Sequence, residues 1–546
     1  MAMHRRDFLK SLASFGCFSS LGSLGQLALS KQAIAAAPDF NDYKALVCIF
    51  LYGGNDAFNM LVPTSTDANK GYEPYADVRG GLAVSSKDLG IDQVTTNHGN
   101  LNQGVLGSGG QNPYNQNLNQ STAYTRGIYP LSGKGIDLGV NGVMPELAQL
   151  IIDNRTSILA NSGTLIRPVT RAEIADKSAE LPVYLFAHNH QQRILQTGQA
   201  DNLNDIGWAG KIADQWNNIN HNSPFGLNIS YAGNDRMLIG NNSSPLVLSP
   251  GNIPSINYLT GNSGVNTDRR ALFNALAGIQ GSTTKLDFDA NRTDAVSDPF
   301  RILYSDKALN AVSTFDQLKQ SWESVELNYT TTGSYGEALF EVPTAQQLGF
   351  TQSVSGKLIR QLEAVAKMIH LAASGNLGAD FNRQIFFVEL SGFDTHASQA
   401  AQHPLLLREL SLALWKFQKA LEELGYADQV TSFTMSDFGR SLSFNGDGTD
   451  HAWGSHQLVM GGYGSGDAGM INGGKMFGQL PEMVLSGSDD YSSKGRMIPT
   501  FSQEQVNAPL LQWFGVEQSQ IANLFPHIRN FQSGGSIETA YTPIFV

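Results

Sequence analysis

Carboxylate, imidazole and guanidinium side chains gather in one short stretch of this chain. Residues 434–440 read Thr-Met-Ser-Asp-Phe-Gly-Arg and overlap the end of an apolar run of strand length, 430–435. This segment and the residues after it contribute Asp437, Arg440, Asp450, His451 and His456. Carboxylates and imidazoles at the carboxyl end of a parallel strand form the metal or phosphate sites of many α/β enzymes. The stretch therefore predicts part of an active site.

Two further acidic clusters follow apolar runs. Asp56 comes after Gly53 and Gly54, which allow the backbone to turn sharply at the end of a predicted strand. A helix N-cap is the alternative role for Asp56. Asp394 and His396 are separated by one residue and follow another apolar run. They predict either two ligands of one metal or an Asp–His hydrogen-bonded pair.

Arginine and histidine candidates complete the set. Arg440 carries a planar fork of donors that matches a phosphate or sulfate, and a salt bridge to a site carboxylate is its alternative role. His188 and His190 are both ligand candidates only if they lie on an extended segment, because on a helix they would point apart. A surface or capping role is the alternative for these histidines.

Common catalytic signatures are missing from the sequence. No GxSxG elbow, Walker A loop, GxGxxG turn or CxxC pair stands where it would be needed. Residues 445–450 resemble a calcium loop but lack the distal glutamate, so they predict a turn. What remains is a site of carboxylates and histidines from distant parts of the chain.

The elements that must position these residues are visible as apolar runs and stripes. Strand-length runs occur at 45–51, 157–160, 385–390 and 430–435. Runs that are apolar on both faces are typical of parallel strands covered by helices. A helical stripe at 358–372 precedes the run at 385–390, and another at 406–424 lies between that run and the one at 430–435. The pattern predicts an α/β fold with a doubly wound, mostly parallel sheet and helices on both faces.

Two regions are expected to be insertions. Residues 96–120 are rich in Asn, Gln and Gly and predict a long exposed loop. Residues 240–345 show few periodic patterns and predict a helical and loop insertion that caps the sheet. We therefore expect a single domain over 36–546, with insertions near 90–125 and 240–345.

The N-terminus predicts export. His4-Arg5-Arg6-Asp7-Phe8-Leu9-Lys10 is a twin-arginine motif, and small residues follow at cleavage spacing near 33–35. Residues 1–35 are thus expected to be a signal read by the twin-arginine translocase, which would place the mature protein in the periplasm or outside the cell. A disordered basic tail is the alternative. Glycines break the stretch, so no stable membrane span is expected.

Composition narrows the classes of partner. The formal net charge is −12 and no basic stripe offsets it, so nucleic-acid binding is disfavoured. Cys48 alone would remain after cleavage at the predicted site, which excludes an internal disulfide in the mature chain. A metal or a large core must therefore supply stability.

The chain resembles the domain-of-unknown-function 1501 family in stretches that run in family order. They are LYGGNDAFNMLVP (51–63), MPELAQL (144–150), AHNHQQRILQTG (187–198), IGWAGKIAD (206–214), LSGFDTH (390–396), MSDFGRSLSFNGDGTDHAWGSH (435–456) and the glycine-rich MGGYGSG and INGGKMFG. That family is grouped with the alkaline phosphatase and sulfatase superfamily. The resemblance implies an alkaline phosphatase-like core with one or two divalent ions, such as zinc, calcium, magnesium or manganese, at the strand ends.

The resemblance also implies roles for single residues. The metal ligands would be Asp56, Asp394, His396, Asp437 and a late histidine, His451 or His456. Arg440 and His188 would be catalytic. The chain departs from the pattern at Phe438, where a metal-binding histidine is expected, and at Ala187, where family members show serine. No serine or threonine stands clearly in the nucleophile position.

Two functions follow from the resemblance and its departures. The first is an exported, metal-dependent hydrolase of a phosphate or sulfate ester, acting on a small molecule or a glycan. The second is a non-catalytic binding or assembly protein of the cell envelope with a degenerate hydrolase site. Genes of the family often neighbour those of another exported family, which implies a partner protein.

Overall fold

A computed structural model describes residues 40–90, 120–216, 219–220, 225–251, 253, 314–377, 381–462 and 470–546. The predicted signal, residues 1–35, lies outside the described residues, as do most of the predicted insertions. In the described part of the chain, no helix is both long enough and apolar enough to cross a membrane.

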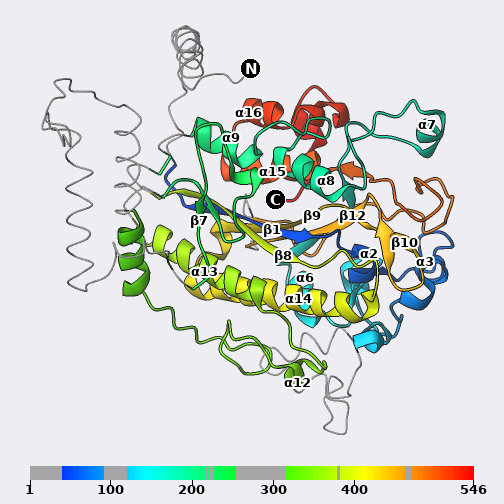
Figure 1. The fold of residues 1–546 in the computed structure, drawn as a ribbon, viewed down its shortest axis with the longest axis horizontal. Helices are drawn as coiled ribbons and strands as arrows, with labels where there is room; N and C mark the ends of the chain where they lie inside the picture. The colour runs from blue at the N-terminus through cyan, green and yellow to red at the C-terminus, as the bar shows by residue number, and fades with distance from the viewer. Residues whose placement is uncertain are drawn as a thin grey trace, which may run out of the picture.

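A nine-stranded sheet forms the centre of the molecule (Figure 1). Its strands follow the order β13-β5-β12-β9-β1-β8-β6-β7, and β14 also pairs with β5. All pairings are parallel except those of β12 with β5 and β9. The prediction of a mixed α/β fold with a large, mostly parallel sheet is therefore confirmed.

Four sheet strands coincide with the predicted apolar runs: β1 (Lys44–Tyr52), β5 (Thr156–Gly163), β8 (Arg383–Ser391) and β9 (Val430–Ser436). The other strands of the sheet are β6 (Asn228–Ser230), β7 (Leu246–Val247), β12 (Ser455–Met460), β13 (Met476–Gly478) and β14 (Phe501–Ser502). Two small sheets stand apart: β10 (Arg440–Phe444) with β11 (Thr449–His451), and β2 (Leu61–Pro63) and β3 (Ile128–Pro130) beside β4 (Leu138–Asn141).

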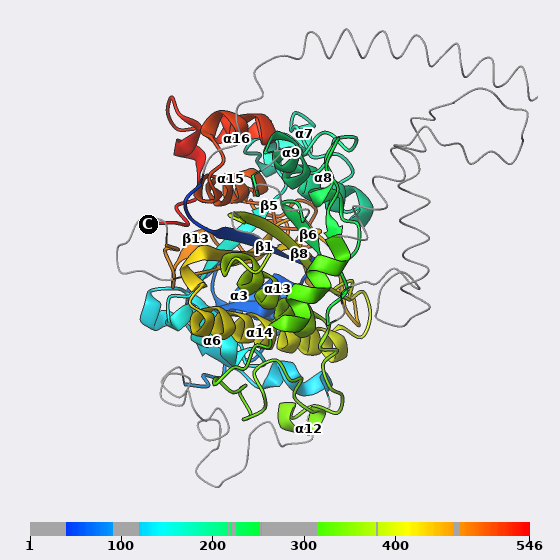
Figure 2. The same ribbon diagram turned by 90° about the vertical axis from the view of Figure 1, so that its left-hand side faces the viewer.

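The strand β1 is apolar on both faces because each face packs into a different hydrophobic cluster. Val47 and Ile49 belong to a cluster that includes residues of α6 (Pro145–Ile152), α13 (Lys357–Ala373) and α14 (Gln399–Leu424). Cys48 and Phe50 belong to a second cluster, with residues of α9 (Trp208–Gln215), α15 (Gln503–Phe514) and α16 (Gln518–Leu524). Figures 1 and 2 show these two groups of helices on opposite sides of the sheet. Each fully buried large apolar side chain contributes roughly 1.5–3 kcal/mol.

The two predicted helical stripes are confirmed, with one shifted boundary. The helix α14 begins at Gln399, earlier than the stripe at 406 suggested, and contains Pro404 near its start. Proline removes a backbone donor, so the sequence around it resembles a helix start rather than an interior. The helix ends at Gly425, whose φ of 79° suits a left-handed cap.

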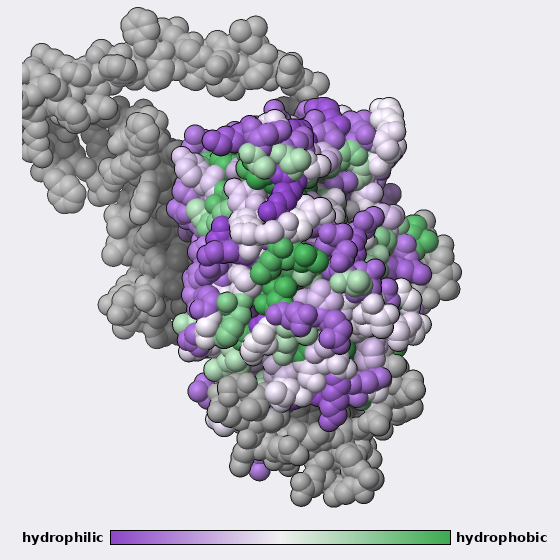
Figure 3. Space-filling model, turned by 90° about the vertical axis from the view of Figure 1, so that its right-hand side faces the viewer, coloured by the Kyte–Doolittle hydropathy of each residue, from purple (hydrophilic) through white to green (hydrophobic). Residues whose placement is uncertain are grey.

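The remaining regular elements are short. The helices are α2 (Ala57–Met60), α3 (Tyr72–Arg79), α7 (Arg171–Asp176), α8 (His188–Thr197) and α12 (Ala345–Leu348). The face that carries α3, α7 and β10 is mainly polar, with one apolar group near its middle (Figure 3). Of the elements in this region, α8 and the β10–β11 pair supply residues to the candidate site.

Candidate metal centre

Three neighbouring parallel strands bring their carboxyl ends to one edge of the sheet. β8 and β9 lie on either side of β1. Gly53 directly follows β1, Asp437 directly follows β9, and Asp394 is the third residue after β8. Gly53 has a φ of 115°, and a Cβ atom there would lie 2.3 Å from the backbone nitrogen of Asp394. Only glycine therefore allows the β1 and β8 loops to approach this closely.

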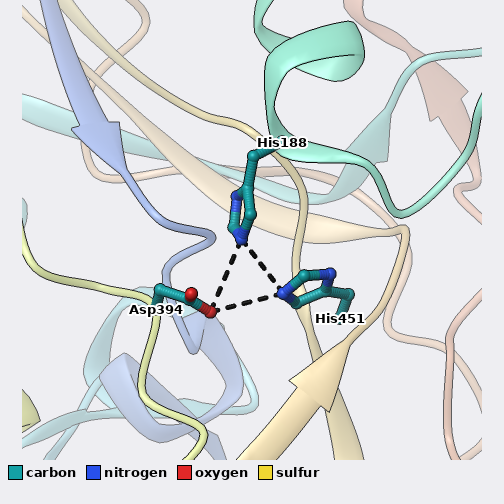
Figure 4. Close-up of side chains that lie close together, drawn as sticks. All are labelled: His188, Asp394 and His451. Atoms are coloured by element: carbon teal, nitrogen blue, oxygen red, sulfur yellow. Dashed lines mark hydrogen bonds and ion pairs between the residues drawn. The ribbon is translucent and has the colours of Figure 1, made fainter.

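Three side chains from distant parts of the chain point toward one another at this edge (Figure 4). The Nε2 atoms of His188 and His451 are 3.0 Å apart. The Oδ1 atom of Asp394 is 3.5 Å from His188 Nε2 and 3.3 Å from His451 Nε2. Ligands of a tetrahedral zinc ion, with bonds of about 2.0–2.1 Å, stand roughly 3.3–3.4 Å from each other. The triangle thus has the size of one face of a metal tetrahedron.

The hydrogen bonds behind the two imidazoles orient their lone pairs toward the centre of this triangle. His451 Nδ1 lies 2.8 Å from the carbonyl oxygen of Phe186, which only accepts, so Nδ1 carries the proton. His188 Nδ1 lies 2.6 Å from a carboxylate oxygen of Asp437 and donates to it in the same way. Both neutral rings then present bare Nε2 atoms to one another and to Asp394. A cation between them removes this repulsion, and such outer partners are usual for metal-bound histidine.

His396 extends the cluster toward solvent. Its Nε2 atom is 2.8 Å from His451 Nε2 and 3.1 Å from Asp394 Oδ1. Its Nδ1 atom is 3.5 Å from Asp450 Oδ1. The side chains of His396 and Asp394 are 44% and 47% exposed, so a small molecule can reach this edge. Both alternatives for the Asp394–His396 pair, metal ligands and a direct Asp–His contact, are compatible with this geometry.

The electrostatic surroundings favour an ionised carboxylate at Asp394 and a neutral imidazole at His451. Burial alone would raise the pKa of Asp394, but Arg440 holds the pKa of that carboxyl below its ordinary value. Burial, together with neighbouring positive charge, lowers the pKa of His451. The hydrogen bond to Asp437 raises the pKa of His188 despite partial burial. Metal ligands must be deprotonated at the ligating atom, and these shifts suit that requirement at Asp394 and His451.

Arg440 is held inside the protein. The side chain is fully buried, and its Nη1 donates to Asp394 Oδ1 at 2.8 Å. Its other donors reach the backbone oxygens of Gly53 and Thr449 and the hydroxyl of Thr449. These contacts match the salt bridge that was the alternative role for Arg440. The arginine therefore positions Asp394 in this structure.

Asp437 stands behind His188, away from the centre of the triangle. Its Oδ2 atom accepts from His188 Nδ1, from Gln192 Nε2 at 2.9 Å and from the Gly53 backbone at 3.2 Å. The carboxylate is 0% exposed. This is the position of a group that orients a ligand, whereas the sequence predicted a ligand.

Asp56 and His456 do not join the cluster. The Asp56 carboxylate is buried and binds Arg79 and Gln399, each at 2.5 Å. Asp56 occupies the N-cap position of α2, as its alternative role required, but its side chain makes no cap hydrogen bond to that helix. His456 is buried on β12, where its Nδ1 accepts from the backbone of Asn161 at 3.0 Å and its ring packs on Phe58. Burial lowers the pKa of His456 to about 3.

The helix α8 explains how His188 and His190 separate. His188 is its first residue, and on a helix the two side chains diverge, as expected for that case. The His190 ring stacks on Tyr184, with centroids 4.3 Å apart. Gln192 lies one turn after His188 on the same face and was not predicted, although the i,i+4 spacing in His188-Asn189-His190-Gln191-Gln192 could have indicated it.

Phe438 also has a defined position in the site. Its ring lies against both His188 and His451, with centroid distances of 4.7 Å to each. The residue is almost fully buried. It forms an apolar wall behind the two imidazoles. Such a wall restricts ring rotation and limits the approach of water to the back of the site.

The fold and the cluster together define an α/β protein with a candidate His–Asp–His metal centre at the carboxyl ends of parallel strands. A family model described as "Protein of unknown function (DUF1501)" matches residues 373–501. The match includes Asp394, His396, Asp437 and His451, and it supports the resemblance to that family over this part of the chain. A comparison with curated proteins gave no match.

Proposed function

We propose that this chain is an exported, metal-dependent hydrolase of phosphate or sulfate esters. The observation that carries the metal part is the convergence of His188 Nε2, His451 Nε2 and Asp394 Oδ1, with both imidazole tautomers fixed from behind. The ester class, an alkaline phosphatase-like core and export by the twin-arginine translocase are supported by the sequence motifs and the family resemblance.

The residues would divide the work as follows. His188, His451 and Asp394 hold a divalent ion, and His396 lies beside them at the exposed edge. When bound, such an ion polarises an ester and lowers the pKa of a water. In the described part of the chain, no serine or threonine hydroxyl contacts the three candidate ligands. Water is therefore the nucleophile in this proposal.

The buried groups preorganise the ligands. Arg440 fixes Asp394, the Phe186 carbonyl fixes His451, and Asp437 with Gln192 fixes His188. None of these groups needs to move when a metal binds. A ligand set that is already oriented loses little conformational entropy on binding, which favours affinity.

Metal content tests this proposal directly. The mature chain, prepared without a metal-affinity tag, is loaded with zinc, manganese or calcium, dialysed and analysed by elemental mass spectrometry. About one equivalent of one metal is expected for the wild type. H451A should lose the bound metal, because the substitution removes one of the three candidate ligands. H370Q, at a histidine outside the site, is the matched control and should keep it.

Retention of no metal by the wild type would contradict the proposal. Full retention by H451A would contradict the assignment of the ligands. Hydrolysis is tested separately with generic phosphate and sulfate esters on the loaded protein. Turnover that D394N abolishes, without a loss of folding by circular dichroism, is the expected result.

A second function is favoured by two observations. Phe438 stands where the superfamily motif has a metal-binding histidine, and the donors of Arg440 are used by partners within the protein. These features suit a non-catalytic binding or assembly protein of the cell envelope, acting with a second exported protein. A loaded protein that binds metal but turns over no ester would favour this alternative.

A further inference from the structure

Arg496 carries a guanidinium group that no carboxylate of the described residues neutralises. Among the described residues, no hydrogen bond or ion pair to its side chain is formed, and its Nε atom is buried without a partner. Its backbone nitrogen donates to Asp490 Oδ1 at 3.1 Å. The Asp490 carboxylate also accepts hydrogen bonds from other backbone nitrogens of the same loop, including those of Ser492 and Ser486. The loop thus fixes the arginine without cancelling its charge.

The position of Arg496 links it to the candidate metal centre. Its Cζ atom lies 4.5 Å from the centroid of the Phe186 ring. The carbonyl oxygen of the same Phe186 accepts the hydrogen bond from His451 Nδ1. Phe186 therefore contacts Arg496 through its side chain and the candidate ligand His451 through its backbone carbonyl.

Backbone strain at Phe186 adds to this link. Phe186 has a φ of 72°, and Tyr184 nearby has a φ of 51°. The left-handed region is sterically costly for bulky aromatic residues, and residues in such conformations concentrate at functional sites. The strained turn leads into α8, which begins with His188. The same turn thus contacts Arg496, hydrogen-bonds to His451 and leads directly into His188.

The other arginine of the site is not available for a substrate. Arg440 is fully buried and its donors are used by Asp394, Gly53 and Thr449. Arg496 keeps part of its surface exposed. In a chain with a formal net charge of −12, an arginine without a described carboxylate partner, one residue removed from the candidate ligand His451, is a local attraction for anions.

We propose that Arg496 binds a second anionic group of the substrate, separate from the ester that reacts at the metal. Its planar fork suits a carboxylate, sulfate or phosphate. Because Phe186 lies between Arg496 and His451, the two anionic groups of the substrate are separated by at least one side chain's thickness. The inference rests on the proposed function, and it narrows the substrate class to esters that carry a further negative charge.

Binding of synthetic anions to the zinc-loaded mature chain tests the inference by calorimetry. Methylphosphonate has one anionic group, and a series of phosphonocarboxylates with growing spacers has two. At least one member of the series should bind more tightly than methylphosphonate. R496Q should weaken that member on the order of ten- to a hundredfold, as expected for a charge-assisted pair, and leave methylphosphonate unchanged. R496K should fall between wild type and R496Q, because it keeps the charge without the fork.

R529Q, at an exposed arginine elsewhere, controls for the loss of one positive charge. An effect of R496Q no larger than that of R529Q would overturn the inference, as would equal binding of all probes by the wild type. Failure of the metal centre has a different signature. In that case methylphosphonate would bind equally well after the metal is removed by a chelator, while the effect of R496Q on the longer probes would still be measurable.

Discussion

Replacement of Asp437 by asparagine should separate a ligand from a group that orients a ligand. The carboxylate oxygen Oδ2 accepts from three donors: His188 Nδ1 at 2.6 Å, Gln192 Nε2 at 2.9 Å and the backbone of Gly53 at 3.2 Å. Asparagine has almost the same shape but only one acceptor oxygen. Because all three donors reach the same oxygen, the amide oxygen of asparagine can take the place of Oδ2, but it is neutral and supports the His188 ring less strongly as a metal ligand.

The size of the effect follows from the role of the carboxylate. Loss of an outer partner of a histidine ligand typically costs 10- to 100-fold in metal affinity, which is about 1.4–2.7 kcal/mol. A lost ligand would instead remove binding almost completely. Protein stability should also fall by about 1–1.5 kcal/mol, the difference between a hydrogen bond to a buried charged group and one to a neutral group.

Competition with a zinc chelator measures the affinity, and nitrogen-15 spectra of the ring report the His188 tautomer. D447N, in the exposed turn between β10 and β11, is the control and should change neither. Unchanged zinc affinity in D437N would refute the proposed support of His188 by the Asp437 charge. Coupling between D437N and Q192A in a double-mutant cycle would show that both act through the same hydrogen-bond group.

Three other predictions concern the scaffold. E146Q should destabilise the protein by about 3–5 kcal/mol in urea unfolding, because it breaks the buried ion pair with Arg408; an unchanged midpoint would contradict the importance of this pair. G53A should lower both stability and metal affinity, because its Cβ would meet the backbone of Asp394 at 2.3 Å; normal zinc binding would show that the loops can shift. Burial raises the pKa of Asp235 to about 6, so ionisation costs stability as the pH rises from about 4 to 6. D235N should therefore have a free energy of unfolding about 1–3 kcal/mol above that of the wild type at pH 8, and the two proteins should be equally stable at pH 4. The same difference at both pH values would contradict this sign.

The sheet was predictable because strands that are buried on both faces appear in the sequence as largely apolar runs. The run at 45–51 is apolar at every position, the run at 385–390 is interrupted only by Glu389, and the run at 430–435 contains small Ser and Thr residues among its apolar ones; each became a central parallel strand. The antiparallel β12 was not predicted. Its sequence, Ser-His-Gln-Leu-Val-Met, begins with three polar residues, so the pattern did not indicate a buried strand. Such polar residues are tolerated inside when neighbouring backbone groups bind them, as Asn161 does for His456.

The candidate site was predictable only at the level of strand ends. Sequence position indicated that Asp394 and Asp437 lie at the same edge, but not which way each carboxylate points. Asp56 turns inward because Arg79 and Gln399, distant in sequence, meet it there. Gln192 and the Phe186 carbonyl were missed because their roles depend on hydrogen bonds that residue types alone do not encode.

The order of strands in the central sheet has a consequence for the timing of assembly. β1 is made early, yet its two neighbours are β8 and β9, so Lys44 must wait for Arg383 to be synthesised before they pair. Contacts this distant along a chain slow folding, because the intervening loop must close first. Until then His188, Asp394 and His451 lie on independent segments of chain. Metal uptake by this centre would thus be one of the last events in folding, and bound metal would serve as a marker of chains that are complete.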